Sequence, residues 1–127
     1  MISVKIDGLD ELAAALDKAA AKVPDVKKQF LAKEAGIIRG RAMKRTPVDT
    51  GLLRGSWKQT PASNNSVTVY NNVHYGIFVE KGHRVKAKGK FTGKVVPGRN
   101  MLRNAVEETK ANFRQDGMAI LNSIFGG

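Results

Sequence analysis

The chain has 127 residues, 42% of them hydrophobic and 26% charged, which is typical of one globular domain spanning residues 1–127. It contains no cysteine, which excludes disulfides and thiolate metal sites, and no stretch approaches the roughly 18 apolar residues of a membrane span. The net charge of +11 favours contact with phosphates or acidic protein surfaces. The amino terminus lacks the apolar run of a signal peptide, so we expect a soluble protein made in a cytoplasm.

The amino-terminal third of the chain predicts one strand and two helices. Apolar and polar residues alternate over residues 2–6, which indicates a short strand. Apolar residues then recur at helical spacing over residues 9–23, in a segment rich in alanine. A second helix is expected from about residue 25 to about residue 45. It ends before Pro47, because the residue that precedes a proline avoids the α region.

The middle of the chain predicts β structure. A strand is expected over about 53–60 and a second over 66–70, where Val67 and Val69 share one face. The intervening residues 61–65 are a dense turn signal, so the two strands should form a hairpin. The apolar segment 73–82 fits either a short helix or a strand.

The last third predicts a loop and a long helix. Residues 86–94 are rich in Lys and Gly and nearly free of apolar side chains, which favours a loop. A helix with an apolar stripe follows Gly98. We expect Trp57, Ile77 and Phe78 to help form the core. Together these elements predict an α+β fold, in which a small antiparallel sheet packs with two N-terminal helices and a long C-terminal helix.

Few residues suggest catalysis or metal binding. Asp49-Thr50-Gly51 is the triplet of aspartic proteases, but no apolar strand precedes it to bury and pair the carboxylate, so a turn is the better interpretation. His74, Glu80 and His83 match no helical metal motif. They could in principle serve acid–base cleavage of RNA, although many basic proteins hold such a set by chance. We therefore expect no catalytic residues, no metal and no cofactor.

Residues 81–106 contain no Asp or Glu and only one aromatic residue, Phe91. Sites for single-stranded nucleic acid usually interleave aromatic platforms with positive charge, so this pattern suits phosphate contact without base readout. A solvated loop that orders only against a neighbouring subunit is the alternative. We expect a mobile basic loop at about 84–96. Its candidate residues for contact with DNA or a partner are Arg84, Lys86, Lys88, Lys90 and Lys94.

Three segments together resemble one family. They are TPVDTGLLRGSW at 46–57, YGIFVEKG at 75–82 and PGRNMLRNA at 97–105, and their order and spacing also agree. The family comprises the tail-completion or head–tail joining proteins of long-tailed bacteriophages, often labelled minor tail components. The resemblance spans roughly residues 9–125. Lys81 and Met101 depart from the aromatic residues common at these positions.

The resemblance implies a structural virion protein without enzymatic activity. Its members form a ring, commonly a hexamer, between the head connector or stopper and the tail terminator or tube, and genomic DNA passes through the ring at ejection. The family's motif residues are expected to serve folding and assembly; here they are Thr46, Pro47, Asp49, Thr50, Gly51, Leu53, Ser56, Tyr75, Glu80, Gly82 and Leu102.

Two other classes of function remain open. The basic composition also fits a free nucleic-acid-binding protein, and a small hydrolase or nuclease is a third hypothesis. Within the phage assembly, the chain could instead be a tail terminator or a connector stopper. Particle size separates these classes, because a closed ring favours the structural subunit and a DNA-shifting monomer favours the nucleic-acid-binding protein.

Overall fold

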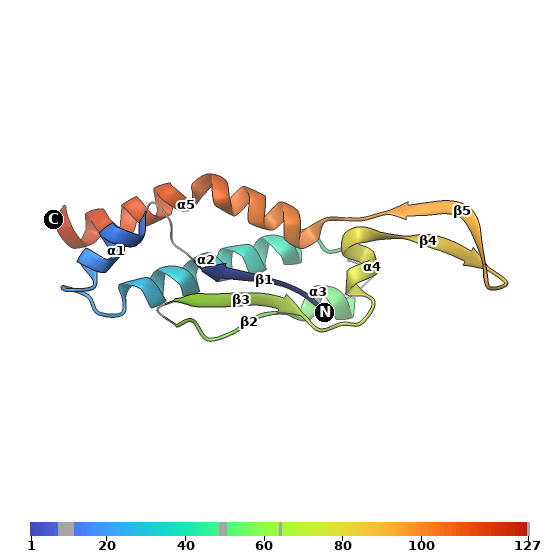
Figure 1. Ribbon diagram of the computed structural model, residues 1–127, viewed down its shortest axis with the longest axis horizontal. Coiled ribbons are helices and arrows are strands. Elements are labelled where there is room, and N and C mark those ends of the chain that lie inside the picture. The colour runs from blue at the N-terminus through green and yellow to red at the C-terminus, as the bar shows by residue number, and fades with distance from the viewer. Residues whose placement is uncertain (8–11, 49–50, 64, 127) are drawn as a thin grey trace.

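The computed structural model describes residues 1–7, 12–48, 51–63 and 65–126. Its elements in chain order are β1 (Ile2–Asp7), α1 (Ala13–Ala19), α2 (Val26–Arg45), α3 (Gly51–Gly55), β2 (Trp57–Gln59), β3 (Ser66–Asn71), α4 (Gly76–Lys81), β4 (Gly82–Ala87), β5 (Lys90–Pro97) and α5 (Met101–Phe125). The long helices α2 and α5 run beside a short sheet, and the β4–β5 hairpin extends away from them at one end (Figure 1).

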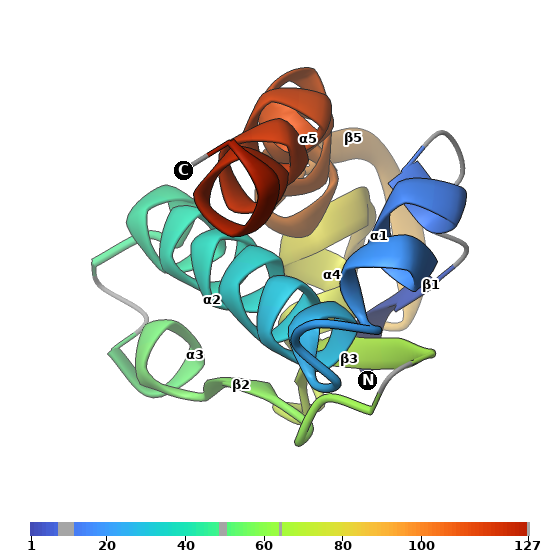
Figure 2. The same ribbon diagram turned by 90° about the vertical axis from the view of Figure 1, so that its left-hand side faces the viewer.

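A three-stranded antiparallel sheet forms one layer of the fold, with β3 between β1 and β2. Val67 and Val69 on β3 are buried while their neighbours are half-buried, as the alternating pattern of this strand requires. Helix α2 packs against β3 and β2, and α5 packs on α2 (Figure 2). The α+β fold predicted from the sequence is therefore confirmed.

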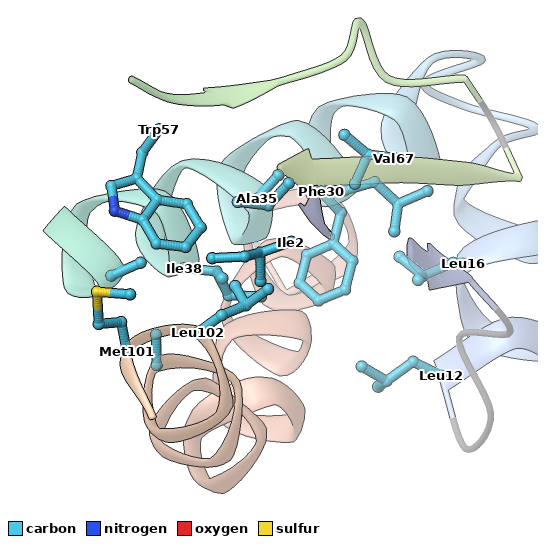
Figure 3. Close-up of a cluster of buried hydrophobic side chains, with 14 of the residues drawn as sticks. Ile2, Leu12, Leu16, Phe30, Ala35, Ile38, Trp57, Val67, Met101 and Leu102 are labelled. Atoms are coloured by element: carbon cyan, nitrogen blue, oxygen red, sulfur yellow. The ribbon is translucent and has the colours of Figure 1, made fainter. Parts of the chain in front are cut away.

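The core lies between α1, α2, the sheet and the inner face of α5 (Figure 3). Phe30 on α2 is fully buried and meets Phe113 on α5 edge to face, with ring centroids 5.0 Å apart. Trp57 is also buried, as predicted, and its indole Nε1 donates a hydrogen bond of 2.8 Å to Thr46 Oγ1. The Thr46 hydroxyl in turn donates to the carbonyl of Ala42 at 2.8 Å, so the end of α2 is tied to β2.

Several element predictions are confirmed with altered bounds. The predicted helix at 25–45 is α2, and the pairing of the two central strands is confirmed in β2 and β3. The segment 73–82 contains a helix, α4. The start of the predicted strand at 53–60 is wrong, because Gly51–Gly55 forms helix α3, which turns Leu53 into the core.

Two of the three predicted core residues do not lie in the core. Phe78 is 55% exposed and Ile77 is only half-buried. Helix α4 is short, and the residues that it buries are Gly76 and Glu80. Gly76 lies close to Ile2 and Leu53, since an added Cβ would meet their Cδ1 atoms at 3.0 and 3.1 Å. Helix α4 therefore packs against the body of the protein through the face that carries Gly76 and Glu80.

The loop expected at 84–96 is instead the β4–β5 hairpin. Lys88 and Gly89 form its turn with φ values of +51° and +77°, as a two-residue type I′ turn requires. Such turns match the twist of the flanking strands, so a polar, glycine-containing segment forms a hairpin without an apolar core beneath it. Its mobility in the free subunit remains a prediction.

Candidate functional site

The base of the hairpin is a joint at which α4, β4, β5 and α5 meet, and its central residue is Glu80. This carboxylate is 5% exposed and accepts hydrogen bonds from two backbone amides at the start of α5. Oε1 lies 3.0 Å from the Leu102 amide nitrogen and Oε2 lies 3.1 Å from that of Arg103. Glu80 thus caps a helix that begins more than 20 residues later, and its charge also complements the helix dipole.

Two glycines permit the backbones to meet at this joint. Gly82 has φ +85°, and a Cβ there would lie 2.5 Å from the Val96 carbonyl oxygen. A Cβ on Gly98 would lie 2.4 Å from the Glu80 carbonyl oxygen. The Arg99 amide also donates to the Val79 carbonyl at 2.8 Å. The atoms that an added Cβ would meet belong to the backbone, which cannot move aside as the end of a flexible side chain can. Both positions therefore require glycine.

Replacing Gly82 with Ala is expected to lower the free energy of unfolding by about 2 kcal/mol, because it adds a backbone clash to the strain of positive φ. Gly89 is the matched control, since it also has positive φ (+77°) but a Cβ there has nothing within 4 Å. Gly89→Ala should lower that free energy by only about 1 kcal/mol. Thermal unfolding of both variants measures the difference, and equal losses would contradict the role assigned to the joint.

The motif residues in and beside α3 join this short helix to the sheet. The Ser56 hydroxyl donates to the Leu52 carbonyl at 2.6 Å, and Asn71 Nδ2 on β3 donates to the Leu53 carbonyl at 2.8 Å. Leu53 is fully buried, whereas Leu52 is 67% exposed. These contacts hold the end of α3 and join α3 to β3.

The remaining motif residues differ in how deeply they are buried. Pro47 and Tyr75 are half-buried, and Tyr75 packs against the core. Leu102 is buried at the start of α5, while Gly51 is exposed. Asp49 and Thr50 lie outside the described residues, so the turn predicted there stays a prediction.

The hairpin places its basic residues around both of its faces rather than on one. Register pairs Arg84 with Val95 and Lys86 with Phe91, and the two cations lie over the Phe91 ring, 5.0 and 4.8 Å from its centroid. Lys90 pairs with Ala87, one residue beyond Lys86 and hence on the opposite face. Lys88 occupies the turn. Lys94 is exposed on β5, and its amide donates to Thr92 Oγ1 at 3.3 Å.

Phe78 lies at the foot of the hairpin, where its ring faces that of His83 with centroids 6.2 Å apart. We expect Phe78→Ala to change the free energy of unfolding by less than about 0.5 kcal/mol, as is usual for exposed positions. Thermal unfolding tests this directly. A loss above about 2 kcal/mol, the cost of emptying a packed site, would show that the side chain is buried in solution.

Sequence reasoning missed Glu34 on α2, whose side chain is fully buried. Neither of its oxygens has a hydrogen-bond partner among the described residues. Burial, and next the neighbouring Asp116 carboxyl on α5, raise the pKa of Glu34 to about 8. Position 34 lies one turn from Phe30 and from Ile38, both buried, so helical spacing was the signal that placed it on the inner face.

Two other features were sought among the described residues: a group of side chains that could bind a metal ion, and a helix that could span a membrane. In the part of the chain that is described, no group of three or more His, Cys, Asp or Glu side chains could hold a metal ion. His74 and His83 are exposed, and both carboxylate oxygens of Glu80 are already occupied by backbone amides. None of the described helices is long and apolar enough to cross a bilayer.

Comparison with known proteins finds a matching family model. The model of a family described as "Bacteriophage HK97-gp10, putative tail-component" matches residues 10–82, more than half of the chain. The match covers α1 to α4 and stops where the hairpin begins. Searches among curated proteins and among solved structures found no match.

Proposed function

Because this chain belongs to the HK97-gp10-like family of bacteriophage tail components, we propose that it is a structural subunit of an oligomeric ring that joins the head connector to the tail. The ring we propose is a hexamer located in the neck of the virion. Genomic DNA passes through it at ejection. The proposed neighbours are the connector or stopper on the head side and the tail terminator or tube on the other.

The observation that carries this proposal is the family match together with what its motif residues do in the fold. Thr46 fixes the end of α2, and Glu80 and Gly82 fix the base of the hairpin. These residues have structural partners rather than positions around an open cavity. Residues that fix one element to another suit a structural subunit, and we propose no enzymatic role for this protein.

The exposed parts of the chain support assembly into something larger. Every residue of β5 is exposed, and the apolar side chains of Phe91 and Val95 are 56% and 67% exposed. A two-stranded hairpin without further support is marginally stable in water. Contact with a partner would therefore stabilise the hairpin, as expected for a subunit that completes its fold in an assembly.

Light scattering and negative-stain images of the purified protein test this proposal. A closed ring is the expected result. A monomer at all concentrations, with virions that assemble normally without the protein, would contradict it. A monomer that shifts DNA would favour the free nucleic-acid-binding protein instead. Tail terminator or connector stopper remains the nearest alternative within the same assembly, and the position of the ring in a virion density map separates these roles.

A further inference from the structure

We propose that the β4–β5 hairpin, residues 82–97, is an arm that binds duplex DNA through its phosphates without reading base sequence. This inference deepens the proposed function and rests on it in one respect, since passage through the ring would bring the genome to the arm. The family match ends at residue 82, the first residue of the hairpin. The role of the hairpin is therefore argued from its own residues.

The charge of the hairpin is uniform. Its basic residues are exposed and have no carboxylate between Glu80 and Glu107 to offset them; they are Arg84, Lys86, Lys88, Lys90 and Lys94. Cations gathered in this way repel one another unless an anion lies among them. The occupant of this surface must therefore bring negative charge.

A second copy of the chain is a poor source of that charge. The chain has 11 acidic residues against 22 basic ones, and three of its described carboxylates, those of Asp17, Glu107 and Glu108, already form ion pairs with Lys27, Lys110 and Arg45 of the same chain. Glu80 is committed to the start of α5. Charge complementarity thus points to a different, anionic partner.

The distribution of the charge favours duplex DNA over an acidic protein. Arg84 and Lys86 lie on one face with Phe91, Lys90 lies on the other, and Lys88 is at the tip. Docking on a protein surface would need charge on one face. A two-stranded ribbon fits the major groove of B-DNA, where it meets phosphates on both sides. Because the hairpin has a single aromatic ring, Phe91, and two of its cations lie over that ring, the arm suits phosphate contact rather than base stacking.

The arm is mounted so that its direction is set by the fold. At its base, the Asn100 amide donates to the Glu80 carbonyl at 3.0 Å and the Arg99 amide to that of Val79 at 2.8 Å. Close backbone contact at Gly82 and Gly98 leaves little room for a hinge there. From this base the strands project beyond the body along its long axis (Figure 1). The cations are therefore presented away from the helices, where a duplex could reach them.

The test compares two variants of the full chain that lose the same charge. In the hairpin variant, Lys86, Lys88, Lys90 and Lys94 become Gln. In the control variant, the exposed residues Lys18, Lys28, Lys44 and Lys58 become Gln. Fluorescence anisotropy with a labelled duplex of mixed sequence is measured over a range of salt concentrations, after circular dichroism has shown that both variants are folded.

The hairpin variant should bind the duplex at least about tenfold more weakly at low salt, and the magnitude of the slope of log affinity against log salt should fall by about 3.6 if each of the four lysines contacts one phosphate. The control variant should change far less in both quantities. Two unrelated duplex sequences should bind wild type equally. Equal losses in both variants would show that only net charge acts, and an unchanged hairpin variant would also overturn the proposal. A strong preference between the two sequences would contradict binding without sequence readout.

Poly-L-glutamate in place of DNA separates the two kinds of anionic partner. If it binds wild type as tightly as the duplex does, and loses as much affinity in the hairpin variant, the arm belongs to an acidic protein neighbour and the DNA proposal fails. Light scattering of the same samples measures ring formation, so it tests the ring proposal independently of the DNA-binding arm. A ring with no hairpin-dependent DNA binding overturns the arm alone, whereas hairpin-dependent DNA binding by a protein that never forms a ring overturns the ring alone.

Discussion

Replacing Glu34 with Gln is expected to raise the free energy of unfolding by about 3–5 kcal/mol at pH values near 9, and to leave it almost unchanged near pH 4. The expectation follows from the position of Glu34 between α2 and α5. Its side chain is fully buried, and its pKa is raised from 4.5 to about 8, first by burial and then by the Asp116 carboxyl. Lys33 and Arg41 lower this pKa, but they do not offset the rise.

The direction of the effect follows from where the proton is held more tightly. Between pH 4.5 and about 8, Glu34 is ionised in the unfolded chain and protonated in the folded one, so the folded state binds more protons. Stability from this group is therefore fully present below pH 4.5 and is lost as the pH rises to about 8. Gln has nearly the same shape and no charge, so it avoids the cost of a buried carboxylate at high pH.

Denaturant unfolding of wild type and Glu34→Gln across this pH range measures the difference. Glu107→Gln is the control, because Glu107 is an exposed residue on α5 and its loss should leave the pH dependence of wild type unchanged. Parallel curves for wild type and Glu34→Gln would show that Glu34 reaches solvent, and would contradict the burial on which the prediction depends.

Sequence reasoning succeeded where local pattern and burial agree. The alternation in residues 2–6 and 66–70 and the helical spacing in residues 26–45 describe elements that each bury one face, so period alone identifies them. Trp57 was placed in the core correctly because it lies on an expected strand, one face of which packs inward. The family resemblance was confirmed over residues 10–82.

The predictions failed where contacts between distant parts of the chain determine burial or secondary structure. Phe78 was assigned to the core by hydrophobicity, but α4 packs through Gly76, whose lack of a Cβ allows close approach to Ile2 and Leu53. The hairpin was taken for a loop because its strands have no buried face, and burial is the signal on which strand prediction depends. Its turn, Lys88-Gly89, was the available local signal.

At the candidate site, the sequence identified Glu80 and Gly82 as motif residues but did not give their roles. A cap normally lies within three residues of its helix, and Glu80 is 22 residues from the amide it caps. Only the path of the hairpin, out and back, brings α4 to the start of α5. The sequence also singled out the basic residues as a group, and their contact with DNA or a partner stays a prediction. Their placement on two faces depends on the hairpin register.

Replacing Glu80 with Ala is expected to lower the free energy of unfolding by about 3–5 kcal/mol, which is on the scale seen when one partner of a buried charged contact is removed. The change leaves the amides of Leu102 and Arg103 without their acceptors at the start of α5. It also removes negative charge from the positive end of a 25-residue helix.

Two further variants make the test of Glu80 specific. Glu80→Gln keeps one acceptor oxygen for the Leu102 amide but turns its NH₂ group toward the Arg103 amide, so its loss should fall between those of wild type and Glu80→Ala. Glu107→Ala on the exposed face of α5 should change the free energy of unfolding by no more than about 0.5 kcal/mol. Thermal unfolding should show a fall of roughly 10 °C in the midpoint for Glu80→Ala. If that midpoint instead matches Glu107→Ala, the carboxylate does not hold α5, and the joint must depend on the backbone contacts of Gly82 and Gly98 alone.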